Sequence, residues 1–134
     1  MADKITDSDF QALASFRREL RIFLQFSETA AGAHGLAPQQ YLALLAIRGA
    51  QNPDVSVGDL ADVLLLKPHS ASELVSRLEK LDLVERHEAQ GDARRRVITL
   101  TERSKTLLNT LSGAHRTELR RIRPLLIRLL DELG

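Results

Sequence analysis

The segment from residue 56 to residue 101 constrains the fold most, because two short helix patterns and one hairpin pattern follow one another there without a gap. Ser56, followed three residues later by Asp59, can cap the start of a helix over residues 57–64. A short turn then leads to Pro68, a residue type that is favoured in the first turn of a helix. Two strand patterns joined by a glycine-containing turn complete the segment. This order of elements predicts a winged helix-turn-helix.

The second helix of this segment, over residues 69–81, is expected to have one apolar side and one small, polar and partly cationic side. Its apolar positions are Ala71, Leu74, Val75, Leu78 and Leu81. Hydroxyls, a histidine and cations on the other side suit an approach to base edges in the major groove of DNA. The residues that we expect to contact DNA on or just before this helix are Lys67, His69, Ser70, Ser72, Ser76 and Arg77. An ordinary solvated helix face is the alternative for this helix taken alone.

The hairpin carries three adjacent arginines. Its strands are expected over residues 83–87 and 95–100, and the turn between them contains Gln90, Gly91 and Asp92. Because adjacent like charges repel one another and arginine suits phosphate pairing and narrow minor grooves, we expect Arg94, Arg95 and Arg96 to contact DNA. We expect Asp92 to form the turn and to pair with Arg94, which would orient the wing. The alternative is a solubilising hairpin tip.

Amphipathic helix patterns flank this segment. The first covers residues 8–31 with Ser8 as its cap, and another over residues 39–48 is expected to bury Tyr41, Leu42, Leu45 and Ala46. After the hairpin, Thr101 caps a further helix, and Pro124 is expected to start a last one. The chain is thus expected to be mainly α with a small β-hairpin wing, an α+β fold.

The terminal helical regions, residues 8–31 and 101–133, carry more apolar surface than one chain can cover, so we expect them to be dimerisation helices around a winged helix-turn-helix at 36–100. The residues that we place in the dimer interface are Phe10, Leu13, Leu20, Leu119, Leu126, Leu129 and Leu130. A two-fold dimer would place its second helices about 34 Å apart, one turn of DNA. The alternative is that these helices close on their own chain's core.

Length and charge limit the partners. With 134 residues, of which 43% are hydrophobic, the chain suits one domain over 1–134. The formal net charge is only +1, so local clusters of cations must attract any nucleic acid. Since neither a secretory signal nor a membrane-spanning run is visible, we expect a soluble, cytoplasmic protein with no membrane partner.

Several kinds of chemistry find no support in the sequence. The absence of cysteine excludes disulfides and thiolate ligands. The four histidines are scattered without metal-ligand spacing, so we expect neither a metal nor a cofactor. No nucleophile-and-base pattern, Gly-rich phosphate loop or carboxylate pair emerges, so we expect that the protein is not an enzyme.

Together these residues resemble the multiple antibiotic resistance regulator (MarR) family of winged-helix transcription factors over almost the entire chain. The motifs that carry the resemblance are Leu-Ala-Pro-Gln-Gln-Tyr at 36–41, Ser-Val-Gly-Asp-Leu-Ala at 56–61, Leu-Val-Ser-Arg-Leu-Glu-Lys at 74–80, Leu-Val-Glu-Arg at 83–86 and Gly-Asp-Ala-Arg-Arg-Arg-Val-Ile-Thr-Leu-Thr at 91–101. The last is close to the family's Asp-x-Arg signature. Asp82 and Ser104 depart from the pattern, because glycine is common at both places. Aspartate tolerates left-handed backbone better than most residues, so we expect such a turn at Asp82.

The resemblance implies a homodimeric repressor of nearby genes that binds double-stranded DNA at pseudo-palindromic operators and is released by a small aromatic or anionic ligand. Asp92 would brace the wing, Arg94 would enter the minor groove, and Arg95 or Arg96 would add phosphate contacts. The residues that would face the major groove are Ser70, Ser72, Ser76 and Arg77. An alternative function of another class is a winged-helix protein-interaction module that no longer reads DNA.

Overall fold

The computed structural model describes residues 4–89 and 91–134, so Gln90, which we placed in the hairpin turn, lies outside the described residues. The chain forms two compact units. We call the first the helical pair: it contains the chain up to Ala30 together with Ser112–Gly134. The second is the winged unit, Ala31–Leu111. Within the described residues, no helix has the length and apolar character that crossing a membrane requires.

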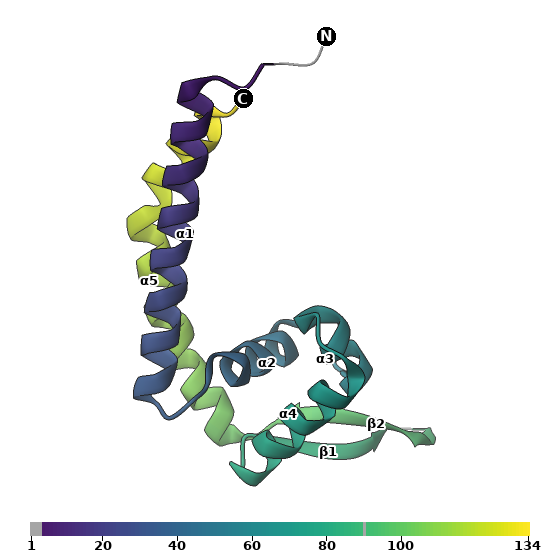
Figure 1. The fold of residues 1–134 in the computed structure, drawn as a ribbon. Helices are drawn as coiled ribbons and strands as arrows, with labels where there is room; N and C mark the ends of the chain where they lie inside the picture. The colour runs from purple at the N-terminus through teal and green to yellow at the C-terminus, as the bar shows by residue number, and fades with distance from the viewer. Residues whose placement is uncertain (1–3, 90) are drawn as a thin grey trace. The chain divides into compact units, whose positions relative to one another are not determined.

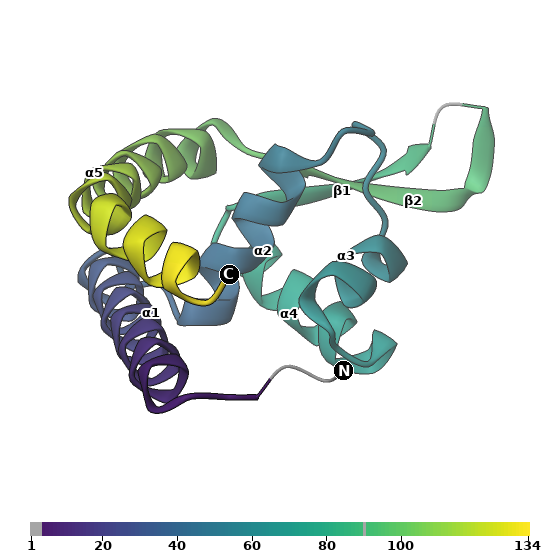
Figure 2. The same cartoon turned by 90° about the horizontal axis from the view of Figure 1, so that it is seen from above.

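In the helical pair, α1 (Asp7–Ala33) runs beside α5 (Glu102–Glu132), as Figures 1 and 2 show. The cap of α1 is Thr6 and not Ser8, so that prediction was wrong. The Thr6 hydroxyl accepts the backbone N–H of Asp9 at 3.1 Å, and the Thr6 N–H donates to the Asp9 carboxylate at 2.9 Å. The helix begins at Asp7 because this reciprocal pair satisfies two N–H groups at its start.

The α5 helix is continuous through Pro124, so the expectation of a new helix starting at that residue was wrong. Proline removes one backbone hydrogen bond and usually ends or kinks a helix. Here Ile122 and Leu129, seven residues apart and therefore on one face, are both buried on either side of Pro124. Burial of the same face before and after the proline stabilises one uninterrupted helix.

The winged unit contains three short helices and a two-stranded antiparallel sheet (Figure 2). These are α2 (Pro38–Gly49), α3 (Val57–Leu64), α4 (Pro68–Lys80), β1 (Val84–Ala89) and β2 (Asp92–Leu100). The expected cap of α3 is confirmed, because Ser56 accepts the Asp59 N–H at 3.1 Å and donates its own N–H to the Asp59 carboxylate at 2.9 Å. The largest fully buried side chains of this unit are Leu44, Leu60, Val75, Leu78, Leu83, Ile98 and Leu111.

The buried side of α2 differs from the expected one. Tyr41 is buried as predicted, but Leu44 is buried in place of Leu42 and Leu45, which are exposed. Nearly every position from Tyr41 to Ile47 is apolar, so two overlapping stripes fit the helical period equally well. Packing against the neighbouring elements selects the stripe that contains Leu44.

The hairpin is longer than predicted, and Asp92 is the first residue of β2 instead of a turn residue. Gly91 has φ +84°, which suits the tight reversal before β2. Pairing runs in register from Val84↔Leu100 to Glu88↔Arg96, and the next pair is Ala89↔Asp92. Residues 93–95 therefore form a bulge on β2, a feature that bends a strand and re-aims its side chains.

Two non-glycine residues have left-handed backbones, each directly after a helix of the helix-turn-helix. Leu65 has φ 56° after α3, and Asp82 has φ 58° after α4, as expected for Asp82. In both turns the next amide bonds back to the helix, Leu66 N–H to Ala61 O and Leu83 N–H to Leu78 O, each at 2.9 Å. This geometry closes a helix C-terminus, and glycine or asparagine normally occupies its left-handed position.

Replacing Leu65 with asparagine is expected to stabilise the winged unit by about 1 kcal/mol, because a left-handed conformation costs a leucine roughly that much. The Leu65 side chain is 91% exposed, so little burial is lost. Chemical denaturation of the two proteins measures the difference. Val63→Asn is the control: Val63 is also exposed but lies within α3, so no stabilisation is expected there. A loss of stability in Leu65→Asn would contradict the assigned strain.

Candidate nucleic-acid interface

The exposed side of α4 carries the polar residues that the sequence placed there. Lys67, at the N-cap, and Ser70 and Arg77 are exposed, and Ser72 and Ser76 are half-buried. A shallow hollow along this side is lined by His69, Ser72, Glu73, Ser76, Arg77 and Lys80. The side chains of Lys67, Arg77 and Lys80 make no hydrogen bond or ion pair with any other described residue. These cations are therefore available to an external anion.

Arg86, on β1, fastens the hairpin to α4. Its Nη2 donates to the Ser76 hydroxyl at 3.0 Å and to the Ser72 carbonyl at 3.3 Å. Its Nε lies 2.8 Å from the Glu79 carboxylate. The Ser76 hydroxyl in turn donates to the Ser72 carbonyl at 3.0 Å. Because its single proton is already engaged, Ser76 can donate no hydrogen bond to a ligand without breaking this network.

The end of α4 is fixed by two residues that precede or begin α5. Arg103 donates to the carbonyl of Leu81 at 2.7 Å, which satisfies an oxygen at the helix end. The Thr101 hydroxyl donates to the carbonyl of Asp82 at 2.8 Å and accepts the N–H of Ser104 at 3.2 Å. Thr101 thus caps α5, as predicted, and also holds the left-handed turn that follows α4.

The three arginines of the hairpin separate into two groups. Arg94 and Arg96 are exposed, and their guanidinium groups have no hydrogen bond or ion pair with another residue in the described part of the chain. Arg95 instead reaches back from the bulge, and its Nη2 donates to the carbonyl of Asp54 at 3.2 Å. Two arginines of the cluster are therefore free for an anion, and the third joins β2 to the loop before α3.

Arg95 also acts on the cap of α3. Hydrogen bonds from Ser56 hold the pKa of Asp59 below its usual value, and the positive charge of Arg95 lowers this pKa further. The lowered pKa means that the carboxylate that caps α3 stays ionised to a lower pH than an ordinary aspartate does.

Asp92 accepts a hydrogen bond from the backbone N–H of Arg94 at 3.0 Å. No ion pair joins its carboxylate to the Arg94 guanidinium in the described residues, so the pairing takes a different form from the one we expected. A side-chain carboxylate bonded to the amide two residues later fixes a local turn of the backbone. The hydrogen bond orders the start of the bulge and leaves the guanidinium group unengaged.

His69 and Glu73 form an exposed pair one helical turn apart. The His69 Nε2 lies 3.1 Å from Glu73 Oε1, and the two side chains are 85% and 58% exposed. Sequence reasoning assigned no role to Glu73, although it is one of the residues that line the hollow on α4.

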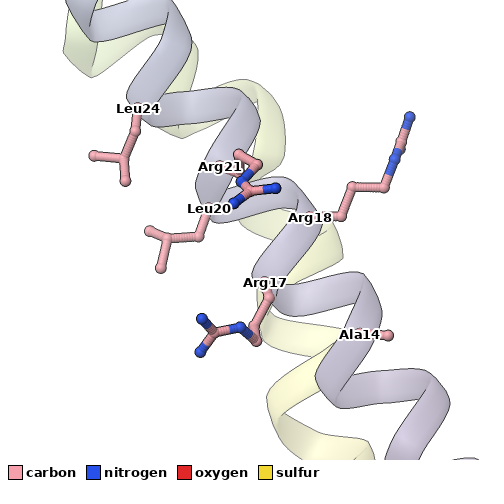
Figure 3. A pocket seen from close by; sticks show the side chains of 6 residues that line it. All are labelled: Ala14, Arg17, Arg18, Leu20, Arg21 and Leu24. Carbon is pink, nitrogen blue, oxygen red and sulfur yellow. The ribbon is translucent and has the colours of Figure 1, made fainter.

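On the helical pair, most of the apolar residues that we assigned to dimerisation are uncovered. Phe10, Leu13, Leu20, Leu119 and Leu130 are exposed, Leu126 is half-buried, and Leu129 is buried within the pair. Figure 3 shows a hollow formed by α1 alone, in which Leu20 and Leu24 project to the same side of the helix. A second hollow on α5 is lined by Arg116, Leu119, Arg120, Arg123, Leu126, Ile127 and Leu130.

Between the helices of this pair lies His115, which is buried. Its Nε2 is 2.7 Å from the Ser27 hydroxyl, and the rings of Phe23 and Phe26 stand edge-on to it at 5.8 and 5.6 Å. Phe23 is thus a packing residue of the pair. Among the described residues no cluster of three or more histidines or carboxylates is suited to hold a metal ion.

Sequence reasoning missed Arg86, Glu79 and Arg103, whose contacts fix the position of α4. Arg86 stands in the Leu-Val-Glu-Arg motif that we used for the family resemblance, but an arginine in a strand pattern predicts no particular partner. Its partners are 7 to 14 residues away in sequence, on another element. Only the folded arrangement identifies them.

Part of the sequence of this chain matches a known family, and its fold is similar to those of known proteins. Residues 34–95 match the sequence pattern of the MarR family. No curated protein matches the chain in sequence. The fold is similar to that of AbsC, a MarR family transcriptional regulator from Streptomyces coelicolor, with 22% identity, a TM-score of 0.71, and coverage of 90% of this chain and 81% of AbsC.

Two further solved structures are similar. A MarR family protein from Bacillus stearothermophilus has 20% identity and a TM-score of 0.75, with 97% of this chain and 96% of that chain covered. MepR from S. aureus, in its complex with DNA, has 20% identity and a TM-score of 0.70, with coverage of 91% and 85%. The expected fold, mainly helical with a hairpin wing, is confirmed.

Replacing Arg86 with alanine is expected to lower the free energy of unfolding by about 1–3 kcal/mol, because the hydrogen bonds of its half-buried guanidinium to Ser72 and Ser76 are lost and Glu79 loses its ion-pair partner. Chemical denaturation measures the change. Lys105→Ala is the control, since Lys105 pairs with Glu102 and both side chains are exposed, a setting in which ion pairs contribute little. Equal losses in the two variants would contradict the role given to Arg86.

Proposed function

Because residues 34–95 match the MarR family, we propose that this protein is a homodimeric transcription regulator that binds double-stranded DNA at a pseudo-palindromic operator. One observation carries the proposal. The exposed side of α4 and the β2 bulge carry cations, Arg77, Arg94 and Arg96 among them, whose side chains have no partner in the described part of the protein. The anionic backbone of DNA is a partner of matching charge for both elements.

In this proposal α4 enters the major groove, where Ser70, Ser72 and Arg77 meet base edges. Lys67 and His69, at the start of the helix, contact phosphate or base. Arg94 enters the minor groove and Arg96 contacts phosphate. The residues that are already engaged act differently, since Ser76 and Arg95 hold α4 and the wing in place and Asp92 braces the bulge.

Two copies are proposed to pair through the helical pair. Its exposed leucines and phenylalanine lie on α1 and α5, and apolar side chains in such number favour burial against a second chain. Phe10, Leu13, Leu20, Leu119, Leu126 and Leu130 are the proposed contacts, and Leu129 supports them from within. A two-fold axis would present two α4 helices to successive turns of one DNA face.

We further propose that the protein represses nearby genes and is released from DNA by a small aromatic or anionic ligand. The family resemblance supports this part of the proposal. Binding of a ligand releases DNA only when the ligand prefers a conformation that the operator does not select.

Selection of bound duplexes from a random DNA pool, at near-physiological salt, tests the proposal. We expect enrichment of a palindrome whose half-sites lie about one helical turn apart. Sequencing the bound pool measures this spacing. If no sequence is enriched, the chain is better explained as a winged-helix interaction module that no longer reads DNA.

The double variant Leu20→Glu/Leu130→Glu is expected to sediment as a monomer and to lose the paired half-sites, because two charges would be buried in the proposed interface. Sedimentation velocity gives the mass, and the DNA selection is repeated with the variant. The control Val63→Glu places the same charge on an exposed apolar position of α3. A dimeric double variant would show that other surfaces join the chains.

Changing Arg94 and Arg96 to alanine is expected to weaken binding to all DNA sequences and to flatten the dependence of log affinity on log salt. The slope should fall by roughly one unit for each phosphate that the dimer no longer neutralises. Titrations between about 50 and 200 mM salt measure it. Arg48→Ala, at the end of α2, is the control for loss of an exposed arginine. An unchanged slope in the double variant would remove these arginines from the interface.

A further inference from the structure

The side of α4 that we propose for the major groove carries one carboxylate, Glu73, that forms no ion pair or hydrogen bond with another described element. Glu79 is paired with Arg86, whereas Glu73 projects from the middle of the helix and contacts only His69 among the described residues. Arg77 is one turn further along and is the usual partner for a glutamate at this spacing. Glu73 nevertheless pairs with His69, one turn towards the start of the helix, and the N–H groups of the Arg77 side chain have no partner among the described residues.

A carboxylate in this place is unfavourable for general DNA binding. The phosphates repel it, and it has no proton to donate to the acceptors that guanine and adenine N7 present in the major groove. The carboxylate can form a favourable hydrogen bond only with a base that presents an amino group in the major groove and no acceptor of its own next to that amino group. Cytosine N4 meets that condition, whereas adenine presents N7 next to its amino group.

The pairing with His69 leaves half of the carboxylate available. Oε1 of Glu73 lies 3.1 Å from His69 Nε2, and Glu73 lines the hollow, so Oε2 is left to accept a hydrogen bond from a ligand there. His69 is the second residue of α4 and Glu73 the sixth, so both belong to the N-terminal half of the helix, the part that meets base edges in helix-turn-helix proteins.

We propose that Glu73 determines sequence specificity by accepting a hydrogen bond from the N4 amino group of cytosine, with His69 as the residue that positions it. This inference rests on the proposed function, and it adds the identity of one base to it. Within each half-site, one base pair is C·G with its cytosine facing Glu73.

The test repeats the DNA selection with the wild type, Glu73→Gln, Glu73→Ala and His69→Ala. The wild type should prefer cytosine at one symmetric pair of positions by about tenfold, a discrimination typical of one base contact. Glu73→Gln should move the preference to adenine, because an amide can both accept from N6 and donate to N7. Glu73→Ala should lose the preference, and His69→Ala should reduce it without moving it to adenine.

Glu102→Gln is the matched control, because it removes one exposed carboxylate outside α4 and should leave the motif unchanged. If both Glu73 variants enrich the wild-type motif and merely bind all DNA more tightly, Glu73 repels phosphate and reads no base, and the inference is overturned. A wild type that enriches no motif counts instead against the proposed function. The wild type and the three α4 variants should unfold at similar temperatures, because both side chains are exposed.

Discussion

The guanidinium of Arg86 is the group on which the geometry of the winged unit depends. From β1 it hydrogen-bonds to a backbone carbonyl and a hydroxyl of α4 and forms an ion pair with a carboxylate of the same helix. A two-stranded hairpin has little stability of its own, so its direction must come from what it packs against. Because the hairpin and α4 are joined at this point, the base of the wing is held against the helix whose polar side carries Arg77. This contact would set the direction in which the wing extends in the proposed complex with DNA.

The helix-turn-helix contains two residues with left-handed backbones, which position the helices relative to the segments that follow them. Leucine is a poor residue for a left-handed turn, yet Leu65 adopts one between α3 and α4, and Asp82 adopts another after α4. Each turn reverses the chain within a few residues and closes its helix with a backbone hydrogen bond. Thr101 and Arg103 then bond to the carbonyls around the second turn. At the second turn, the free-energy cost of the left-handed backbone of Asp82 is thus offset by hydrogen bonds from Thr101 and Arg103, which lie 19 and 22 residues away in sequence from the carbonyls that they contact.

Apart from the cap of α1, which is Thr6 and not Ser8, sequence reasoning succeeded where the signal is local and failed where two parts of the chain must meet. The cap at Ser56, the short helix after it and the proline at the start of α4 follow from spacing over a few residues, and the structure confirms them. The continuity of α5 through Pro124 depends on burial on both sides of the proline. The stripe chosen on α2 and the partners of Arg86 likewise depend on packing between elements. Periodicity alone contains no information about these contacts.

The distribution of charge explains how a chain with a formal net charge of +1 can suit an anionic partner. Some of its cations are paired within the fold: Arg86 with Glu79, Lys105 with Glu102, and Arg121 with Glu118. The cations without such partners in the described residues include Arg77 on α4 and Arg94 and Arg96 on β2. Attraction to a polyanion depends on local potential more than on the total, since salt screens charges beyond about 10 Å. Under the proposed function, the unpaired cations of α4 and β2 would attract this surface to DNA even though the net charge of the protein is small.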